Sequence, residues 1–298
     1  MQPNAAIYKR KAPLAVFLIP AFAFMVLFLY YPFLMNIYNS VCRISGLGTA
    51  AEGVNTPWYK NFAQMLGDEK LHTAFGNTLL MMAVTVVFEV GAALVLALLV
   101  DNIGRGVQFF RTVYFFPIVI SATALGLLFN LIFLYNGGML NQLLLGAGWI
   151  SEAVDWKDER HYLLTMFLPV VWQYVGFYFV IITTGLNNIS PELYEAAAID
   201  GATVPGRIRR ITLPLLHNTL CICVTLAVTG ALKVFDLPWV MMGQGMPLDR
   251  SWLLGTYMYA TTFNAGDVDY GSAIAVVIVV VGVAISQIVS AVLKEKDY

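Results

Sequence analysis

The sequence predicts an all-α membrane protein that crosses the bilayer six times, with both ends of the chain in the cytoplasm. Of its 298 residues, 59% are hydrophobic and 12% are charged, and the mean hydropathy is +0.73. A soluble globular domain is about one quarter charged. A spanning helix needs about 20 mostly apolar residues. Six runs reach this length, at about residues 13–38, 73–100, 112–135, 163–186, 213–240 and 270–293.

The first run is expected to stay in the protein as an anchor behind a cytoplasmic N-terminus, residues 1–12. Ala12 to Val41 contains no charged residue. This run is longer than the apolar core of a cleavable signal peptide, which has about 7–15 residues. It follows three basic residues, Lys9, Arg10 and Lys11, which suit the cytoplasmic side of a membrane.

The distribution of basic residues assigns the two sides of the membrane. With the N-terminus inside, the cytoplasmic segments hold ten Lys and Arg residues and the outer segments hold six, as the positive-inside rule requires. The ten are Lys9, Arg10, Lys11, Arg105, Arg111, Arg207, Arg209, Arg210, Lys294 and Lys296. The sequence therefore predicts a single transmembrane domain over 13–293, a cytoplasmic loop at 190–212 and a cytoplasmic tail at 294–298.

The outer loops are too short to be domains of their own. They comprise Cys42–His72, Asn136–His161 and Met241–Asp269. The second begins Asn-Gly-Gly, a sequence typical of turns, and we expect a short lateral helix around Met139–Leu145 to follow it.

Composition and motifs exclude several functions. A net charge of −1 gives no reason to expect a nucleic-acid partner. The odd number of cysteines, Cys42, Cys221 and Cys223, does not predict a disulfide framework, and their spacing does not predict a metal site. The sequence has no Gly-Lys pair, so it lacks the phosphate-binding loop of ATPases.

The cytoplasmic loop from Ser190 to Leu216 carries the signals of a compact helix–turn–helix. Ser190 suits an N-cap, and Pro191 suits the first helical position. A helix is expected to run to Asp200 and to end at Gly201, because glycine accepts the left-handed conformation. Pro205 is expected to open a second short helix. Local physics alone fits an ordinary connecting loop equally well.

The order of residues in this loop resembles a known motif. Glu195-Ala196-Ala197, then Gly201, then Ile211-x-Leu213-Pro214 resembles the EAA loop of permease subunits in type I ABC importers. The resemblance implies the fold of those permeases and a coupling helix that docks on an ATPase. The residues that it assigns to coupling are Glu195, Ala196, Ala197, Asp200, Gly201, Leu213 and Pro214.

Further stretches resemble the carbohydrate-uptake permeases of this superfamily, including the larger chain of maltose importers. They are Phe110–Pro117, Gly138-x-x-Asn141 and Phe235-Asp236-Leu237. The resemblance implies a non-catalytic subunit in a bacterial or archaeal inner membrane. Its expected partners are a second, different permease subunit, an ABC ATPase dimer that binds ATP and Mg²⁺, an extracytoplasmic solute-binding protein, membrane lipid and a sugar or oligosaccharide. No cofactor is expected in this chain.

An aromatic cluster in the fourth run suits a path for sugars. Trp172-Gln173-Tyr174-x-Gly176-x-Tyr178-Phe179 offers rings that stack on pyranose faces and an amide that hydrogen-bonds hydroxyls, although membrane helices also use aromatic residues for packing. The resemblance implies a path lined by Ile118, Ala122, Trp172, Gln173, Val175, Gly176, Phe179, Ala227, Gly230, Ala231 and Val234. Gly176 and Gly230 equally suit close helix packing.

Three charged residues fall inside the predicted spans: Glu89, Lys233 and Asp236. Such groups are costly in lipid and face protein or water. Lys233 and Asp236 are three residues apart on one expected helix, where they either pair with each other or contact solute. Glu89 is either a buried, hydrogen-bonded group or a solute ligand.

Two other classes of protein compete with the importer. An ion-gradient-driven secondary transporter would use Glu89 as its coupling acid, but its usual inverted repeats are not apparent. An intramembrane protease would need a second acid to accompany Gly266-Asp267, and no facing span offers one.

Overall fold

The computed structural model describes residues 11–103, 106–243 and 245–293, with side chains omitted at 11–14 and 102–103. Over these ranges the chain is mainly helical. Four helices are long and apolar enough to cross a membrane, and the number rises to six if two bent pairs each count as one span. Most of the predicted N-terminus, the predicted tail 294–298 and Arg105 lie outside the described residues, so the charge distribution there stays a prediction.

Contacts divide the chain into two units, residues up to 67 with 261–277, and residues 68–260 with 278 onward. In the first unit, one continuous span is formed by α1 (Lys11–Met25), η1 (Val26–Tyr30) and α2 (Tyr31–Val41). Its 27 residues from Ala15 have no buried positions in their most apolar window. This span is thus free to contact lipid or another protein.

Polar contacts close the end of this unit at which α2 ends. Strands β1 (Cys42–Arg43) and β2 (Gly53–Val54) pair antiparallel, with Cys42 opposite Val54. They lead through α3 (Lys60–Gln64) and η2 (Met65–Gly67). Asn61 on α3 is 2% exposed and donates to the carbonyl of Ser40 at 3.0 Å. Asn36 donates to the carbonyl of Ser272 at 3.3 Å, which ties α2 to the start of α16 (Val268–Val292).

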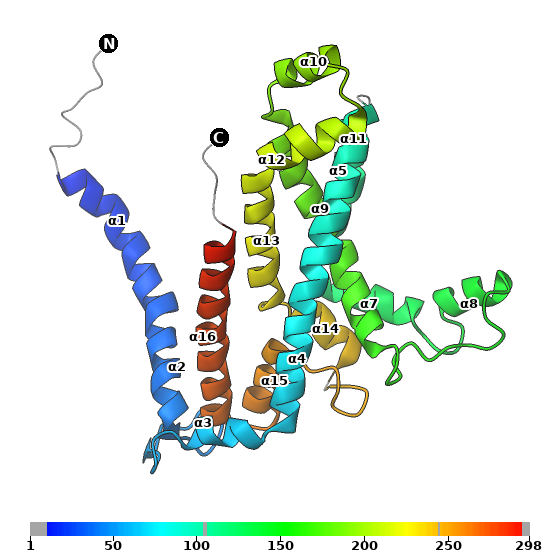
Figure 1. Cartoon of the computed structure of the whole chain (residues 1–298). Coiled ribbons are helices and arrows are strands. Elements are labelled where there is room, and N and C mark those ends of the chain that lie inside the picture. Colours follow the sequence, from blue (N-terminus) through cyan, green and yellow to red (C-terminus); the bar gives the residue numbers. More distant parts are fainter. Residues whose placement is uncertain (1–10, 104–105, 244, 294–298) are drawn as a thin grey trace. The chain divides into compact units, whose positions relative to one another are not determined.

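The second unit is built around two long helices. One consists of α4 (Glu69–Val84), η3 (Thr85–Val90) and α5 (Gly91–Ile103), in which η3 is a π-helical turn. Its N-terminus is capped by Asp68, whose carboxylate accepts the backbone N–H groups of residues 70 and 71. The other is α9 (Tyr162–Asn187), which packs against α5 and η3, as Figure 1 shows.

The third predicted span, 112–135, is not one straight helix. It is divided into α6 (Val107–Val119) and α7 (Ala122–Ile132), whose axes differ by 93°. The backbone is extended at Ile120 and Ser121. This extended segment interrupts the helical hydrogen bonds shortly after Pro117, which has no backbone N–H to donate. The bend lays α7 against α14 (Asp236–Met242).

The fifth predicted span, 213–240, is also interrupted. After α12 (Leu213–Leu215) the chain bends by 67° into α13 (His217–Ala231), and α13 ends well before residue 240. Residues 232–235 are not helical, and α14 begins at Asp236. The prediction that Lys233 and Asp236 lie on one helix is therefore wrong, and no ion pair joins them among the residues with described side chains. The chain continues through α15 (Leu254–Tyr259) and η5 (Ala260–Asn264) to α16.

A short helix is confirmed in the loop between residues 136 and 161, as α8 (Met139–Gly146). The loop is organised by Asn141, which is 1% exposed. Its amide donates to the carbonyls of Tyr135 and Val154 and accepts from the backbone N–H of Val154 and the indole of Trp156. A Cβ at Gly138 would overlap the carbonyl of residue 134. The Gly138-x-x-Asn141 motif thus has a structural role in this loop.

A half-buried amine ties the same loop to the helices. Lys157 Nζ donates to Asn130 Oδ1 at 2.5 Å and to the carbonyl of Met241 at 3.0 Å. Burial lowers the pKa of Lys157, partly offset by the charge of Asp155. This contact joins the loop to α7 and α14.

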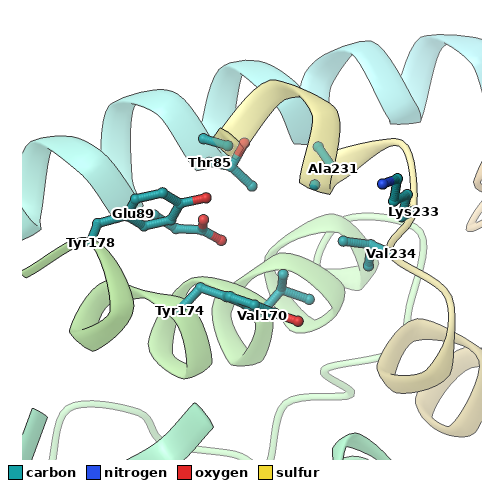
Figure 2. A pocket seen from close by; sticks show the side chains of 10 residues that line it. Thr85, Glu89, Val170, Tyr174, Tyr178, Ala231, Lys233 and Val234 are labelled. Carbon is teal, nitrogen blue, oxygen red and sulfur yellow. The ribbon is translucent and has the colours of Figure 1, made fainter. Parts of the chain in front are cut away.

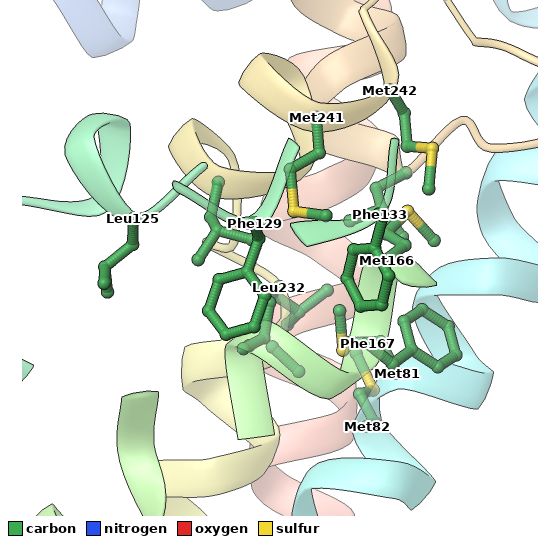
Figure 3. Packing of buried hydrophobic residues seen from close by; sticks show 14 of the residues in the cluster. Met81, Met82, Leu125, Phe129, Phe133, Met166, Phe167, Leu232, Met241 and Met242 are labelled. Atoms are coloured by element: carbon green, nitrogen blue, oxygen red, sulfur yellow. The ribbon is translucent and has the colours of Figure 1, made fainter. Parts of the chain in front are cut away.

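A sulfur-rich hydrophobic cluster lies at the centre of the second unit (Figure 3). Met81, Phe129, Met166, Leu232 and Met241 come from α4, α7, α9, the segment after α13 and α14, respectively. Methionine adapts to irregular gaps, which suits a core where two bent spans meet a long straight helix.

Candidate functional site

The cytoplasmic-loop candidate folds as its local sequence predicts. Helix α10 (Pro191–Ile199) is followed by α11 (Val204–Arg207) and η4 (Ile208–Thr212). Gly201 has φ of +72°. Its N–H donates to the carbonyl of Ala198 at 3.1 Å, and that of Ala202 donates to Ala197 at 2.9 Å. These two bonds form a Schellman motif, which satisfies the last carbonyls of the helix.

The loop presents a mixed polar and apolar surface. Glu195, Ala196 and Asp200 are exposed, whereas Ala197 is buried within the chain itself. Leu213 and Pro214 are half-buried behind it. Ala197 therefore lies on the inner face of α10, and the other three residues are exposed to the surroundings.

Sequence reasoning missed one feature of this surface. Ile199 is 87% exposed, although isoleucine is among the residues that proteins bury most often. Leu193 and Val204 nearby are 45% and 43% exposed. The signal in the sequence that could have predicted this exposed residue was an isoleucine at the end of a short helix in a loop.

The loop is fastened to the spans beneath it. The hydroxyls of Tyr194 and Thr212 lie 3.1 Å apart. Under them is a cavity of about 230 Å³ that is also lined by Asp101 of α5 and Arg207 of α11.

The second candidate site is a cavity of about 210 Å³ among three helical segments of the second unit (Figure 2). Span two contributes residues of η3, α9 contributes one face, and α13 with the segment after it contributes the rest. The lining residues are Thr85, Glu89, Val170, Tyr174, Tyr178, Ala227, Gly230, Ala231, Lys233 and Val234.

Four of the predicted path residues line this cavity: Ala227, Gly230, Ala231 and Val234. Their small side chains leave room between the helices. A Cβ at Gly230 would meet no atom within 4 Å, so this glycine is not needed for helix packing.

The predicted path residues of α9 are divided between packing and exposure. A Cβ at Gly176 would overlap the carbonyl of Tyr114, so Gly176 lets α6 approach α9. Phe179 is fully buried against Tyr114, with ring centroids 5.2 Å apart. Val175 packs against the hydrophobic cluster that contains Phe179. Gln173 is 5% exposed. None of the four lines the cavity.

Three predicted path residues lie near the bend between α6 and α7 or opposite it. Ile118 and Ala122 flank the bend and are half-buried. Trp172 is 44% exposed and packs edge to face on Phe129, with centroids 5.6 Å apart. The structure does not bring these three residues into the cavity.

Two tyrosines of the aromatic cluster line the cavity in place of the predicted path residues of α9. Tyr174 and Tyr178 border the cavity, one helical turn apart on α9. The sequence identified the aromatic cluster, but the resemblance assigned Trp172, Val175 and Phe179 to the path rather than the two tyrosines. Thr85 and Val170 carried no signal at all.

Glu89 is the buried charged residue of this cavity. Its side chain is 2% exposed, and its Oε1 has no hydrogen-bond partner in the described part of the chain. In Figure 2 its carboxyl group points into the space between the helices, beside Tyr178. Lys233 borders the same cavity from the non-helical segment after α13.

Comparison with characterised permeases places the chain. The probable ABC transporter permease protein YurN of Bacillus subtilis is 32% identical over 91% of this chain and 92% of the relative. The lactose transport system permease protein LacF of Rhizobium radiobacter is 29% identical over 84% of this chain and 83% of the relative.

The fold matches that of a solved importer. A permease chain of a bacterial ABC transporter for the import of the acidic polysaccharide alginate superposes with a TM-score of 0.83 at 21% identity, covering 96% of both chains. The same transporter has been solved with an alginate pentasaccharide-bound periplasmic protein. This likeness confirms the expected type I importer permease fold.

The model of one transporter family covers most of the transmembrane domain. That family is described as the binding-protein-dependent transport system inner membrane component, and it matches residues 93–296. The match includes the loop at 190–212 and two of the helical segments that border the cavity, α9 and α13, but it begins after Thr85 and Glu89 of η3. The chain therefore belongs to the family of inner-membrane components of binding-protein-dependent ABC transport systems.

Proposed function

We propose that this chain is the membrane permease subunit of an ATP-driven importer that carries a sugar or oligosaccharide, delivered by an extracytoplasmic binding protein. The observation that carries the sugar assignment is the cavity of Figure 2, where two tyrosines and a carboxyl group border a floor of small apolar residues. Such a mixed lining suits a solute with apolar C–H faces and a rim of hydroxyls. The lactose permease LacF supports the same class of solute.

The cytoplasmic loop is proposed as the docking element for the ATPase. Its exposed surface combines Glu195, Ala196, Asp200 and the apolar Ile199, and an exposed apolar patch with a polar rim is typical of protein interfaces. Gly201 ends the helix in the conformation that this surface requires. Leu213 and Pro214 connect the loop to the fifth span, so movement of the docked loop moves that span as a rigid body.

The other subunits of the proposed importer are separate chains. A second permease subunit, different from this one, completes the path, and a pair of ATPase chains binds ATP and Mg²⁺. This chain is a non-catalytic subunit and needs no cofactor of its own. The binding protein solved with the alginate transporter supports a comparable partner here. Both termini and the α10 loop face the cytoplasm.

The test is ATP-driven uptake by the whole complex. The tagged chain is purified from its native membrane with everything that accompanies it, and the complex is placed in liposomes with its binding protein. Uptake of glucose, lactose, arabinotriose and glucuronate is measured with and without ATP inside the vesicles. Uptake of at least one sugar that requires ATP supports the proposal, and sugar uptake that an ion gradient drives without ATP contradicts it.

A further inference from the structure

The strongest unassigned feature of the molecule is the carboxyl group of Glu89. It lies in the interior of a helix whose other charged residues, Glu69, Lys70 and Asp101, lie near the ends, and the resemblance and the comparisons assign it no role. Ionisable groups at this depth are costly unless they serve a solute or a partner. One of its oxygens is buried and has no partner in the described part of the chain. Because Glu89 lines the cavity, a molecule held there is a candidate partner for this oxygen.

The backbone around the cavity is irregular on two sides. Glu89 belongs to the π-helical turn η3, which interrupts the regular helix formed by α4 and α5. Such turns are frequent at functional sites. Opposite, α13 ends at Ala231, and the non-helical residues 232–235 carry Lys233 into the lining. Within a membrane, non-helical backbone is tolerated where it is buried in protein or borders a water-filled space.

The size of the cavity limits what it holds. About 210 Å³ corresponds to roughly seven water molecules at about 30 Å³ each. It lies below the roughly 300–1,000 Å³ of most ligand pockets. The space therefore suits a single sugar ring rather than a whole oligosaccharide.

The chemistry of the lining suits ring hydroxyls. The carboxyl group of Glu89 accepts hydrogen bonds, the hydroxyls of Tyr174 and Tyr178 both donate and accept, and the ammonium of Lys233 donates. Ala227, Gly230 and Ala231 form a flat apolar floor on the α13 side, which suits the C–H face of the ring.

We propose that Glu89 is a specificity-determining residue of the solute path, whose carboxyl group hydrogen-bonds the hydroxyls of one sugar ring held between Glu89, Tyr174 and Tyr178. The proposal rests on the proposed function, since it needs a sugar to pass through this chain. Glu89 acts here by hydrogen bonding and not by carrying a proton across the membrane. An amide of the same shape therefore replaces it, whereas an apolar side chain does not.

The experiment uses the complete complex in liposomes and the best-transported sugar among glucose, lactose and arabinotriose. Glu89→Gln keeps two polar atoms and is expected to keep KM for uptake within about threefold of the unmodified chain. Glu89→Leu is expected to raise KM at least about tenfold, the effect of losing roughly one hydrogen bond to a buried polar group.

Two further variants distinguish the loss of a hydrogen bond to the sugar from misfolding of the chain. Tyr174→Phe and Tyr178→Phe each remove only a hydroxyl, and both are expected to raise KM without lowering the amount of assembled complex. Glu69→Gln is the matched control, because Glu69 is an exposed acid on α4 of the same span, and it should change nothing.

The outcomes separate this inference from the proposed function. Unchanged KM in Glu89→Leu and both tyrosine variants, with ATP-driven uptake intact, overturns the inference and leaves the importer standing. Loss of uptake in Glu89→Gln with full activity in Glu89→Asp shows that a titratable group is required and also overturns it. If the unmodified complex takes up no sugar with ATP, the proposed function and the inference fail together.

Discussion

At the scale of single residues, two glycines on the predicted path have different roles. Gly176 lies where α9 meets α6, and a Cβ there would overlap the carbonyl of Tyr114. Gly230 faces the open cavity, and a Cβ there meets nothing within 4 Å. Gly176 therefore serves packing, whereas Gly230 leaves space beside the cavity.

Gly176→Ala is expected to destabilise the protein by about 1–3 kcal/mol or more, because the backbone of α6 must move to admit a methyl group. The measurement is the thermal unfolding temperature of the purified chain in mild detergent. Gly230→Ala is the control and should unfold at the same temperature or higher, since alanine favours helix by about 1 kcal/mol over glycine. Equal losses of stability in the two variants would show that the packing assigned to Gly176 is wrong.

The surroundings of the charged residues in the predicted spans are also decided at this scale. Lys233 and Asp236 looked like a pair because a continuous helix would place them one turn apart. The end of α13 at Ala231 removes that geometry and leaves Lys233 beside the cavity with Glu89.

At the scale of elements, the α10 loop is a small unit with its own hydrogen bonds. Its Schellman motif joins Ala197 and Ala198 to the two residues around the turn, and the Tyr194–Thr212 contact holds it to the following segment. These interactions are local in sequence. For this reason the helix, its glycine terminus and the second short helix were all predicted correctly.

Gly201→Asp is expected to abolish ATP-driven uptake while the protein still inserts at normal abundance. The change places a second negative charge next to Asp200 on the proposed docking surface. Gly201→Asn is the matched control, since asparagine and aspartate both tolerate the left-handed conformation at φ of +72° and differ mainly in charge. Uptake and the amount of co-purified ATPase are measured for both. Normal uptake in the aspartate variant would rule out coupling through this turn.

The spans differ from the loop because their breaks depend on distant partners. The bend after α6 sets α7 against α14, where Asn130 donates to the carbonyl of Val240 at 3.0 Å. A run of apolar residues shows that a segment enters the membrane, but it does not show where packing bends it. Pro117 was the local signal for the first break, and Pro214 lies just before the second, at Leu216, but neither residue sets the direction of the bend.

At the scale of the whole molecule, the orientation in the membrane remains a prediction from charge. It requires the α10 loop to be cytoplasmic and the α8 loop to be outside. Two exposed residues test it, because Ile199 is 87% exposed and Trp149 is 80% exposed. The native cysteines are buried, so new thiols at these positions give a clear signal.

Trp149→Cys is expected to react with a membrane-impermeant maleimide in intact spheroplasts, and Ile199→Cys is expected to react only after the membrane is opened. The reason is that the reagent reaches only the outer face of a sealed membrane. Labelling is measured by gel shift, with the unmodified chain as the control. The opposite pattern would invert the topology and remove the ATPase from reach of α10.

The sequence by itself determined the class of the molecule and the local fold of the loop from Ser190 to Leu216. Apolar runs of bilayer length predict a membrane protein because water-free surroundings demand them, and the Glu195–Pro214 motif identified the family that the comparisons confirmed. Only the tertiary structure decided which residues border the cavity. Glu89, Tyr178 and Gly230 come from three helices far apart in the chain. Their meeting depends on the π-helical turn, on the end of α13 and on the close approach at Gly176, and each of these is settled by packing between segments rather than by local sequence.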